Sequence, residues 1–325
     1  MSFDSVQDQI VELLSDNEEQ QFIFLTGAAG TGKTTLLERV KHQLSSKKIV
    51  VAPTGIAALN IGGTTINSAF RIGFETIPVI TKSKDPRFAK LLKNLELLII
   101  DEVSMVRAPM LDAISQSLQI YKRSTEPFGG IHVLACGDLF QLPPVVKQHE
   151  EREIYDRYDS IYFFDALSFK EVKNVKYFQL DKSFRQEEDE GFYELLNNIR
   201  IGSDLEKTIN KINSQCFDPT LESDAYMTLT SRKNRAEELN NHKLTYLDSP
   251  EEIIKSKEFG DLNENDLPAP RELKIKQGAS VMFIKNDSEG RWVNGTLGTV
   301  AECLDKKKKC IKVKINNKTH KVERE

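Results

Sequence analysis

The chain has 325 residues, of which 39% are hydrophobic, and its formal net charge at pH 7 is −4. This length suits about two domains, each with its own core, and the weakly acidic balance excludes binding of nucleic acid through overall positive charge. The sequence contains no apolar stretch of membrane-spanning length, no signal-peptide pattern and no Cys-x-x-Cys pair, which favours a protein of the reduced cytoplasm without a zinc site or disulfide framework.

The first predicted strand leads into a glycine-rich loop. Residues 22–25 are apolar, residues 27–34 are Gly-Ala-Ala-Gly-Thr-Gly-Lys-Thr, and residues 35–40 have the pattern of a helix. In this context the glycines let backbone N–H groups face an anion at the helix N-terminus. Lys33 can then reach the β- and γ-phosphates of a nucleotide, and Thr34 can hold Mg²⁺. The predicted nucleotide site comprises Gly27, Ala28, Gly30, Thr31, Gly32, Lys33, Thr34 and Thr35.

Short apolar runs predict three further strands, at residues 49–52, 97–100 and 132–136. A helical pattern lies between the last two, at residues 110–121. Continuous apolar strands that alternate with helices predict an α/β domain with a parallel sheet covered on both faces, here over residues 1–181.

Two polar segments follow the second strand, at residues 52–58 and 63–70. Their small hydroxyl side chains and free helix N-termini suit contacts with phosphodiester groups. Phe70 could stack on a base, although a phenylalanine considered alone is more often a core residue. Residues 71–92 then show no clear period and contain two prolines, so we interpret them as an insertion.

The third strand ends in two acids, Asp101 and Glu102. A phosphate-binding loop needs such a partner, because the first acid can support Mg²⁺ and the second can deprotonate the attacking water. An exposed acidic strand end is the common alternative. The position of the pair on a neighbouring strand, downstream of the glycine-rich loop, favours the nucleotide site.

The fourth strand is followed by Gly-Asp-Leu-Phe-Gln-Leu-Pro-Pro at residues 137–144. Ligands bind outside the carboxyl ends of parallel strands, so this segment should face the same crevice. Gln141 is placed to sense a γ-phosphate or its water. The alternative, a proline-terminated turn, is favoured when the segment is considered by itself.

A second α/β unit is predicted from residue 182 onward. Its expected elements are helices at residues 192–199, 205–212 and 232–247 and a strand at residues 226–230. Residues 248–271 are rich in Pro, Asp, Glu and Asn and are interpreted as a connector. Short β-like runs follow at residues 280–284, 299–304 and 311–315.

Two features of this second unit carry charge that could serve a function. Arg185, in Ser-Phe-Arg-Gln, could reach across a cleft and neutralise a transferred phosphoryl group, although a lone arginine is usually a surface residue. Lysines gather near the end of the chain, at residues 306–309, 312, 314, 318 and 321. A local nucleic-acid patch and a solvated strand edge are equally good interpretations of that run.

The ordered set of motifs resembles the PIF-type and RecD-like DNA helicases of superfamily 1, group B. The motifs that carry the resemblance are GAAGTGKT, APTGIAA, DEVSM, GDLFQLPPV, SFRQ and SEGRWVNGTLG, and they extend over essentially the whole chain. Any one of them could mislead, but their order makes the set highly specific. The match is close to bacterial PIF-type proteins.

The resemblance implies an ATP- and Mg²⁺-dependent motor that moves 5′-to-3′ on single-stranded DNA. It implies a P-loop NTPase with two RecA-like domains, at residues 1–181 and 182–298, and a small wedge insertion at residues 71–92. Residues 299–325 would begin an SH3-like insertion. The implied partners are single-stranded DNA and tailed duplex DNA, acted on by a monomer in the bacterial cytoplasm, at the nucleoid. DNA repair, recombination and telomere maintenance are the implied processes.

The resemblance also implies roles for individual residues. Gln7 would read adenine, with Gln9 close enough to compete. Lys33 and Thr34 would bind phosphate and Mg²⁺, Asp101 would support Mg²⁺, and Glu102 would be the catalytic base. Gln141 would couple nucleotide state to DNA, and Arg185 would be an arginine finger. The implied DNA contacts are Thr54, Gly55, Asn67, Ser68 and Phe70, with Thr230 and Asn234 as weaker candidates.

The chain departs from the family pattern in two places. Asn67 stands where many relatives have histidine, which leaves a polar contact of uncertain strength. The later family blocks, a His-Lys-Ser-Gln-Gly type and a Val-Ala-Leu-Ser-Arg type segment, are absent from the sequence. We therefore expect a truncated helicase with impaired unwinding. The rival hypotheses are a nucleotide-gated DNA-binding module without motor activity and, less favoured, a small-molecule phosphotransferase.

Overall fold

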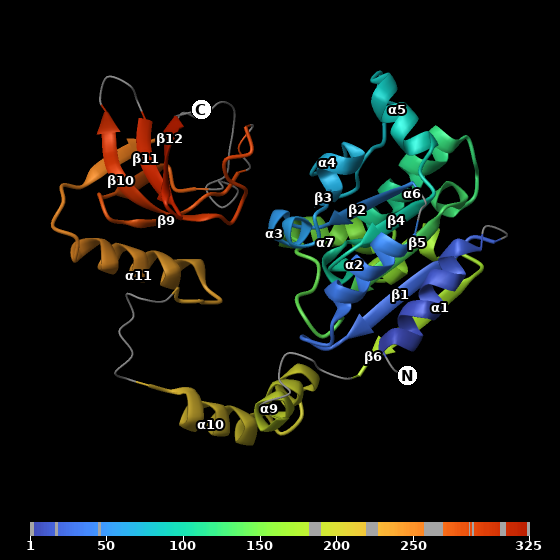
Figure 1. The fold of residues 1–325 in the computed structure, drawn as a ribbon, viewed down its shortest axis with the longest axis horizontal. Coiled ribbons are helices and arrows are strands. Elements are labelled where there is room, and N and C mark those ends of the chain that lie inside the picture. The colour runs from blue at the N-terminus through green and yellow to red at the C-terminus, as the bar shows by residue number, and fades with distance from the viewer. Residues whose placement is uncertain are drawn as a thin grey trace. The chain divides into compact units, whose positions relative to one another are not determined.

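The computed structural model describes residues 3–16, 19–44, 47–181, 190–218, 227–256, 269–285, 287, 289–305 and 310–323. The chain divides into two compact units, Met1–Phe217 and Asp218–Glu325, which are described separately (Figure 1). No helix in the described part of the chain is long and apolar enough to cross a membrane.

The first unit is built on a six-stranded sheet in which every pair of neighbouring strands is parallel (Figure 1). The strand order is β3-β2-β4-β5-β1-β6. The strands are β1 (Phe22–Gly27), β2 (Lys48–Ala52), β3 (Thr64–Thr65), β4 (Leu97–Ile100), β5 (His132–Gly137) and β6 (Val175–Leu180). This architecture confirms the predicted α/β fold with a parallel sheet.

The apolar strands pack against helices on both faces of the sheet. In β1, Phe22 and Phe24 belong to one buried cluster, whereas Ile23 and Leu25 belong to the other. Successive strand residues point to opposite faces, so this alternation is what a sheet covered on both sides requires. The carboxyl ends of β1, β4 and β5 therefore lie along one edge of the sheet, above a core that fixes their positions.

Different helices cover the two faces of the sheet. α1 (Phe3–Ser15) and α2 (Lys33–Gln43) contribute to the cluster that contains Ile23, whereas α6 (Ala108–Lys122) contributes to the cluster that contains Phe24. Shorter helices complete the layers: α3 (Gly55–Asn60), α4 (Ile66–Phe70), α5 (Pro86–Lys93), α7 (Gln148–Tyr155) and α8 (Leu167–Lys170). Three-residue and four-residue 3₁₀ turns lie at Val103–Met105, Pro127–Gly130 and Phe163–Asp165.

The segment interpreted as an insertion is partly helical and partly packed on the core. α5 begins after Asp85, whose carboxylate accepts hydrogen bonds from the first helical N–H groups. Phe88 packs edge-on against Tyr121 with ring centroids 5.4 Å apart. Two apolar side chains of the irregular part are highly exposed, Phe74 at 86% and Val79 at 82%. A wedge function for residues 71–92 stays a prediction.

Two helices beyond the sheet also belong to the first unit. α9 (Glu190–Ile201) and α10 (Leu205–Cys216) match the helical patterns predicted there. The compact unit ends at Phe217, and the boundary of a first RecA-like domain after residue 181 stays a prediction. An ion pair between Arg200 and Asp138 connects α9 to the loop after β5.

The second unit contains one helix and two small antiparallel sheets in its described residues. The helix is α11 (Lys233–Thr245), and β7 (Glu252–Lys255) pairs with β8 (Glu272–Ile275). The larger sheet has the order β12-β11-β10-β9, with β9 (Ser280–Met282), β10 (Leu297–Asp305), β11 (Cys310–Ile315) and β12 (Lys318–Glu323). No parallel sheet occurs among these residues, so a second RecA-like domain stays a prediction.

Two expectations for the second unit need correction. Residues 227–230, predicted as part of a strand, form none, because Leu229 is 88% exposed and no strand lies beside it in the described chain. The predicted connector at residues 248–271 contains β7, which buries little and so left a weak apolar pattern. Of the clustered lysines, Lys312 pairs with Glu302 and Lys321 with Glu323, whereas residues 306–309 lie outside the described residues.

Candidate functional site

The loop between β1 and α2 has the geometry of an anion cradle. Gly30 and Gly32 adopt φ values of 80° and 86°, a left-handed conformation that glycine accepts without steric cost. A Cβ at Gly27 would lie 2.6 Å from Thr31 Oγ1 and 2.7 Å from the Leu180 carbonyl oxygen, so that position needs glycine. No side chain caps the N-terminus of α2. Its first N–H groups therefore suit a phosphate group.

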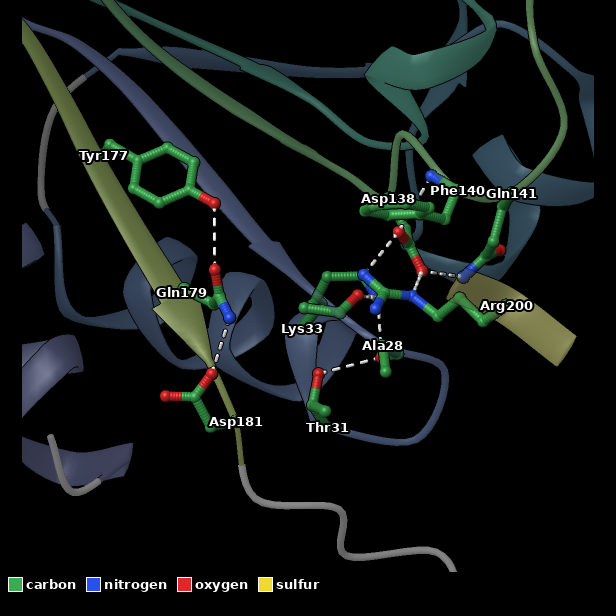
Figure 2. A network of polar contacts seen from close by, with 11 residues as sticks. Ala28, Thr31, Lys33, Asp138, Phe140, Gln141, Tyr177, Gln179, Asp181 and Arg200 are labelled. Atoms are coloured by element: carbon green, nitrogen blue, oxygen red, sulfur yellow. Dashed lines mark hydrogen bonds and ion pairs between the residues drawn. The ribbon is translucent and has the colours of Figure 1, made fainter. Parts of the chain in front are cut away.

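Polar contacts hold this loop in shape. Lys33 Nζ donates hydrogen bonds to the carbonyl oxygens of Gly27 and Ala28, at 2.7 and 3.0 Å. Thr31 Oγ1 donates to the Ala28 carbonyl oxygen at 2.9 Å (Figure 2). Thr34 and Thr35 lie exposed in the first turn of α2. Lys33 thus already points its ammonium group into the loop where phosphates would bind.

The carboxyl end of β4 carries two carboxylates in a poorly solvated position. Asp101 is 5% exposed, and burial raises its pKa, while a hydrogen bond from the Glu102 N–H and the Lys33 charge oppose the rise. Burial also raises the pKa of Glu102, and the Asp101 charge adds to that rise. Glu102 adopts a φ of 51°, which is uncommon for a residue with a side chain and is often found at functional sites.

The carboxyl end of β5 is followed by Asp138, both of whose carboxylate oxygens accept hydrogen bonds. Asp138 is 1% exposed, and Arg200 donates to it from Nε and Nη2, both at 2.9 Å. Gln141 Nε2 donates to Asp138 Oδ2 at 3.0 Å, and the Phe140 N–H donates to Oδ1 at 3.1 Å. Figure 2 shows the Asp138 carboxylate between the Gln141 amide and the Arg200 guanidinium. Burial raises the pKa of Asp138, but these hydrogen bonds outweigh it and lower the pKa.

These groups form one electrostatic cluster. The charges of Lys33 and Asp138 both act on the Glu102 carboxylate, the first lowering and the second raising its pKa. The structure therefore brings together the candidate phosphate lysine, the candidate metal and base carboxylates, and the loop that holds Gln141. Such a set suits Mg²⁺ and phosphate, because carboxylate oxygens are the ligands that Mg²⁺ prefers. Arg185, the candidate finger, lies outside the described residues.

The candidates for adenine recognition lie on α1. Gln7 is 7% exposed, donates to Gln43 Oε1 at 2.8 Å and accepts from Arg39 Nη1 at 3.4 Å. Gln9 is half-buried and donates to Ser5 Oγ at 3.2 Å. Both amides have partners within the protein, so neither glutamine is singled out as the adenine reader.

The candidate DNA-binding residues of the first unit mostly shape their own turns. Thr54 accepts a hydrogen bond from the Ala57 N–H at 3.3 Å and so caps α3, next to Gly55. Asn67 Nδ2 donates to the carbonyl oxygens of Ile72 and Gly73, at 3.1 and 3.0 Å. Ser68 is exposed, and its hydroxyl accepts from Thr65 Oγ1 at 2.8 Å. Ser68 is the most accessible of these polar side chains.

The stacking role predicted for Phe70 is wrong in this structure. Phe70 is 3% exposed and belongs to the cluster that also contains Ile66 and Val51. A buried ring has no face to offer a base, so the core interpretation of this residue holds. In the second unit, Thr230 and Asn234 are exposed, and the Thr230 hydroxyl accepts a hydrogen bond from the Arg232 N–H at 3.3 Å.

Sequence reasoning missed Asp138 and Arg200 as members of the site. Asp138 directly follows an apolar strand, as Asp101 does, and this shared position was a usable signal. Arg200 had no local signal, because it sits in an ordinary amphipathic helix and meets Asp138 only in the folded unit.

Comparison with known proteins gives one consistent family. A model of the PIF1-like helicase family matches residues 2–210. The ATP-dependent DNA helicase PIF1 of Candida albicans is 33% identical over 306 residues, which covers 87% of this chain and 33% of that protein. The ATP-dependent DNA helicase Pif1 of Bdellovibrio bacteriovorus is 32% identical over 306 residues, covering 91% of this chain and 66% of that protein. The chain thus spans about a third of the length of the PIF1 helicases of Candida albicans and Saccharomyces cerevisiae.

Solved structures agree with the sequence comparison. Bacteroides Pif1 bound to single-stranded DNA matches with a TM-score of 0.84 and 36% identity, covering 99% of this chain and 74% of that one. Bacteroides Pif1 in complex with ADP-AlF₃ and single-stranded DNA matches with a TM-score of 0.83 and 37% identity, covering 99% and 75%. The family match extends over more than half of the sequence and includes the loop and both acidic strand ends, so the chain belongs to the PIF1-like helicase family.

Proposed function

We propose that the chain binds and hydrolyses ATP at the carboxyl edge of its parallel sheet, as part of a helicase that moves 5′-to-3′ on single-stranded DNA. The observation that carries the proposal is the convergence of the β1–α2 loop with the acidic ends of β4 and β5 at one edge. A phosphotransferase acting on a small molecule would share the loop but would not account for the family membership.

In this proposal each part of the edge has its own task. The N–H groups of the loop and Lys33 hold the phosphates, and Thr34 and Asp101 hold Mg²⁺. The raised pKa of Glu102 suits a general base, because a base whose pKa approaches the working pH accepts a proton most efficiently. Gln141 senses the γ-phosphate, and Arg185 supplies a finger. Gln7 or Gln9 reads adenine.

DNA contacts are proposed for Thr54, Gly55, Asn67 and Ser68 in the first unit and for Thr230 and Asn234 in the second. Thr54 and Ser68 lie at the N-termini of α3 and α4, where backbone N–H groups can also meet phosphate oxygens. Binding should be largely blind to sequence and should weaken as salt rises, since neutralised phosphates release counterions. We place this activity in the bacterial cytoplasm and expect a monomer to suffice.

ATP hydrolysis measured with and without single-stranded DNA tests the proposal, with Lys33→Ala as the control that should lose hydrolysis. DNA-stimulated hydrolysis supports a motor, and nucleotide-dependent DNA binding without hydrolysis supports a gated binding module. Strand displacement on duplexes with a 5′ or a 3′ tail tests direction. Preference for the 3′ tail would contradict the proposed direction.

A further inference from the structure

The Arg200–Asp138 ion pair joins two parts of the first unit that lie 62 residues apart in sequence. Arg200 comes from the last turn of α9, and Asp138 directly follows β5. The Arg200 side chain is 22% exposed and the Asp138 side chain 1%. Two parallel N–H···O bonds of 2.9 Å fix both the distance and the orientation of the planar groups.

The same carboxylate orients Gln141. Asp138 Oδ2 accepts from Arg200 Nε at 2.9 Å and from Gln141 Nε2 at 3.0 Å. With its amide nitrogen held there, Gln141 directs its Oε1 away from Asp138, as Figure 2 shows. Gln141 is an exposed residue, so this oxygen is open to solvent.

Arg200 also balances charge near the candidate base. The negative charge of Asp138 raises the pKa of Glu102, so the two carboxylates interact. A buried carboxylate without a partner is costly, and Arg200 lowers the pKa of Asp138 by bonding to it. The Phe140 ring lies under the guanidinium, 4.5 Å from Cζ to the ring centroid, and supports the same placement.

We propose that Arg200 is a positioning residue for ATP hydrolysis: through Asp138 it holds the Gln141 amide in one orientation at the carboxyl edge of the sheet, where ATP would bind. The inference rests on the proposed hydrolytic function. α9 begins a few residues after Arg185, so the pair also anchors the helix that follows the candidate finger. Arg200, which lies on a helix that follows the last strand of the sheet, would thus help to position a side chain of the ATP site.

A double-mutant cycle separates this role from a purely structural one. The variants are Gln141→Ala, Arg200→Ala, Arg200→Lys and the double variant Gln141→Ala/Arg200→Ala. The readouts are kcat and KM at saturating single-stranded DNA and Mg²⁺, together with the melting temperature. Arg107→Ala is the matched control, because Arg107 forms another buried pair, with Glu150 at 3.1 Å and side-chain exposures of 14% and 11%.

Arg200→Ala should lower kcat by about 100-fold, the cost of misplacing a group in the site, and change KM little. The loss in kcat of the double variant should be well below the product of the two single losses, since Arg200 acts on hydrolysis mainly through Gln141. Arg200→Lys keeps the charge but loses the two parallel bonds, so its kcat should fall between those of the parent and Arg200→Ala. If Arg200→Ala does not fold, Arg200→Lys carries the test. Arg107→Ala should lower the melting temperature and leave kcat within about twofold of the parent.

Two results would overturn the inference. The first is a folded Arg200→Ala or Arg200→Lys with the kcat of the parent. The second is a double variant whose loss in kcat equals the product of the two single losses, as independent effects require. A parent chain that binds ATP–Mg²⁺ but does not hydrolyse it would instead overturn the proposed function, and the inference with it.

Discussion

A buried aspartate directly follows each of the neighbouring strands β4 and β5, but the pKa values of the two carboxyl groups are shifted in opposite directions. Burial raises the pKa of Asp101, and Lys33 acts on it through its charge without forming an ion pair. Asp138 is even less exposed, but bonds from Arg200 and Gln141 lower its pKa. Asp138 thus forms an ion pair with a cation of the protein, whereas Asp101 does not.

This difference indicates what each strand end is for. A buried carboxylate without a cation is unfavourable, and a Mg²⁺ ion at Asp101 would relieve that cost. Asp138 has no such need, because all its strong bonds are made within the chain. The end of β4 is thus suited to receive a ligand, and the end of β5 is suited to position the protein's own groups around it.

The largest expected effect concerns the base at the end of β4. Glu102→Gln should lower the rate of ATP hydrolysis by about 10²–10⁴, because it removes proton transfer from the attacking water. ATP–Mg²⁺ binding should persist, since Asp101 and Lys33 remain. Nucleotide affinity by fluorescence and turnover by phosphate release check this prediction. Hydrolysis at the parent rate would show that Glu102 is not the base.

The next effect compares the two aspartates in stability. Asp138→Asn should lower the free energy of unfolding by about 3 kcal/mol, because it leaves the Arg200 charge without its partner. Asp101→Asn should leave the nucleotide-free protein equally stable or make it more stable, since it removes a charge that burial penalises. Urea denaturation of both variants measures the difference. Equal losses of unfolding free energy in the two variants would contradict the proposed difference between Asp101 and Asp138.

Ligand-induced stabilisation sharpens the same contrast. ADP–Mg²⁺ at 100 times its Kd should stabilise the parent by about 2.7 kcal/mol. Omitting Mg²⁺ should reduce this gain in the parent and in Asp138→Asn, whereas Asp101→Asn should already have lost the Mg²⁺-dependent part. Thermal melts with ADP, with and without Mg²⁺, provide the measurement. A full Mg²⁺ effect in Asp101→Asn would place the ion elsewhere.

The smallest effect is a dependence on pH with opposite signs at the two strand ends. The folded-state pKa of Asp138 is depressed, so its contribution to stability is present at neutral pH and is lost as pH falls through that pKa. The folded-state pKa of Asp101 is raised, so protonation as pH falls relieves a cost. Asp138→Asn should therefore flatten the acid loss of stability, and Asp101→Asn should steepen it. The reverse pattern would contradict the assignment.

The acidic residues after β4 could be predicted from sequence as part of the site, whereas the ion pair formed by the aspartate after β5 could not. Asp101 and Glu102 follow a strand made only of apolar residues, and that local pattern fixes their place at the sheet edge. Arg200 meets Asp138 only because α9 returns to the sheet. Phe70 shows the same limit, since it belongs to a cluster that includes Val51 of β2, a residue that local sequence does not bring to it.

The second unit was harder to predict because it buries little. α11 has no buried side chain, yet its helix was predicted at residues 232–247. β7 alternates between half-buried and exposed residues, leaves no strong apolar period, and was missed. The β9–β12 sheet was better predicted, since Val300, Val313 and Ile315 point into its core. Apolar periodicity reports burial, and it weakens wherever an element lies at the surface.

Carboxyl NMR titration of Asp101 and Asp138, assigned through their asparagine variants, tests the central claim most directly. The account predicts a pKa above the ordinary aspartate value for Asp101 and below it for Asp138. Addition of ADP–Mg²⁺ should lower the pKa of Asp101 and leave that of Asp138 nearly unchanged. Equal values for the two residues, the reverse order, or a Mg²⁺ response at Asp138 alone would contradict it.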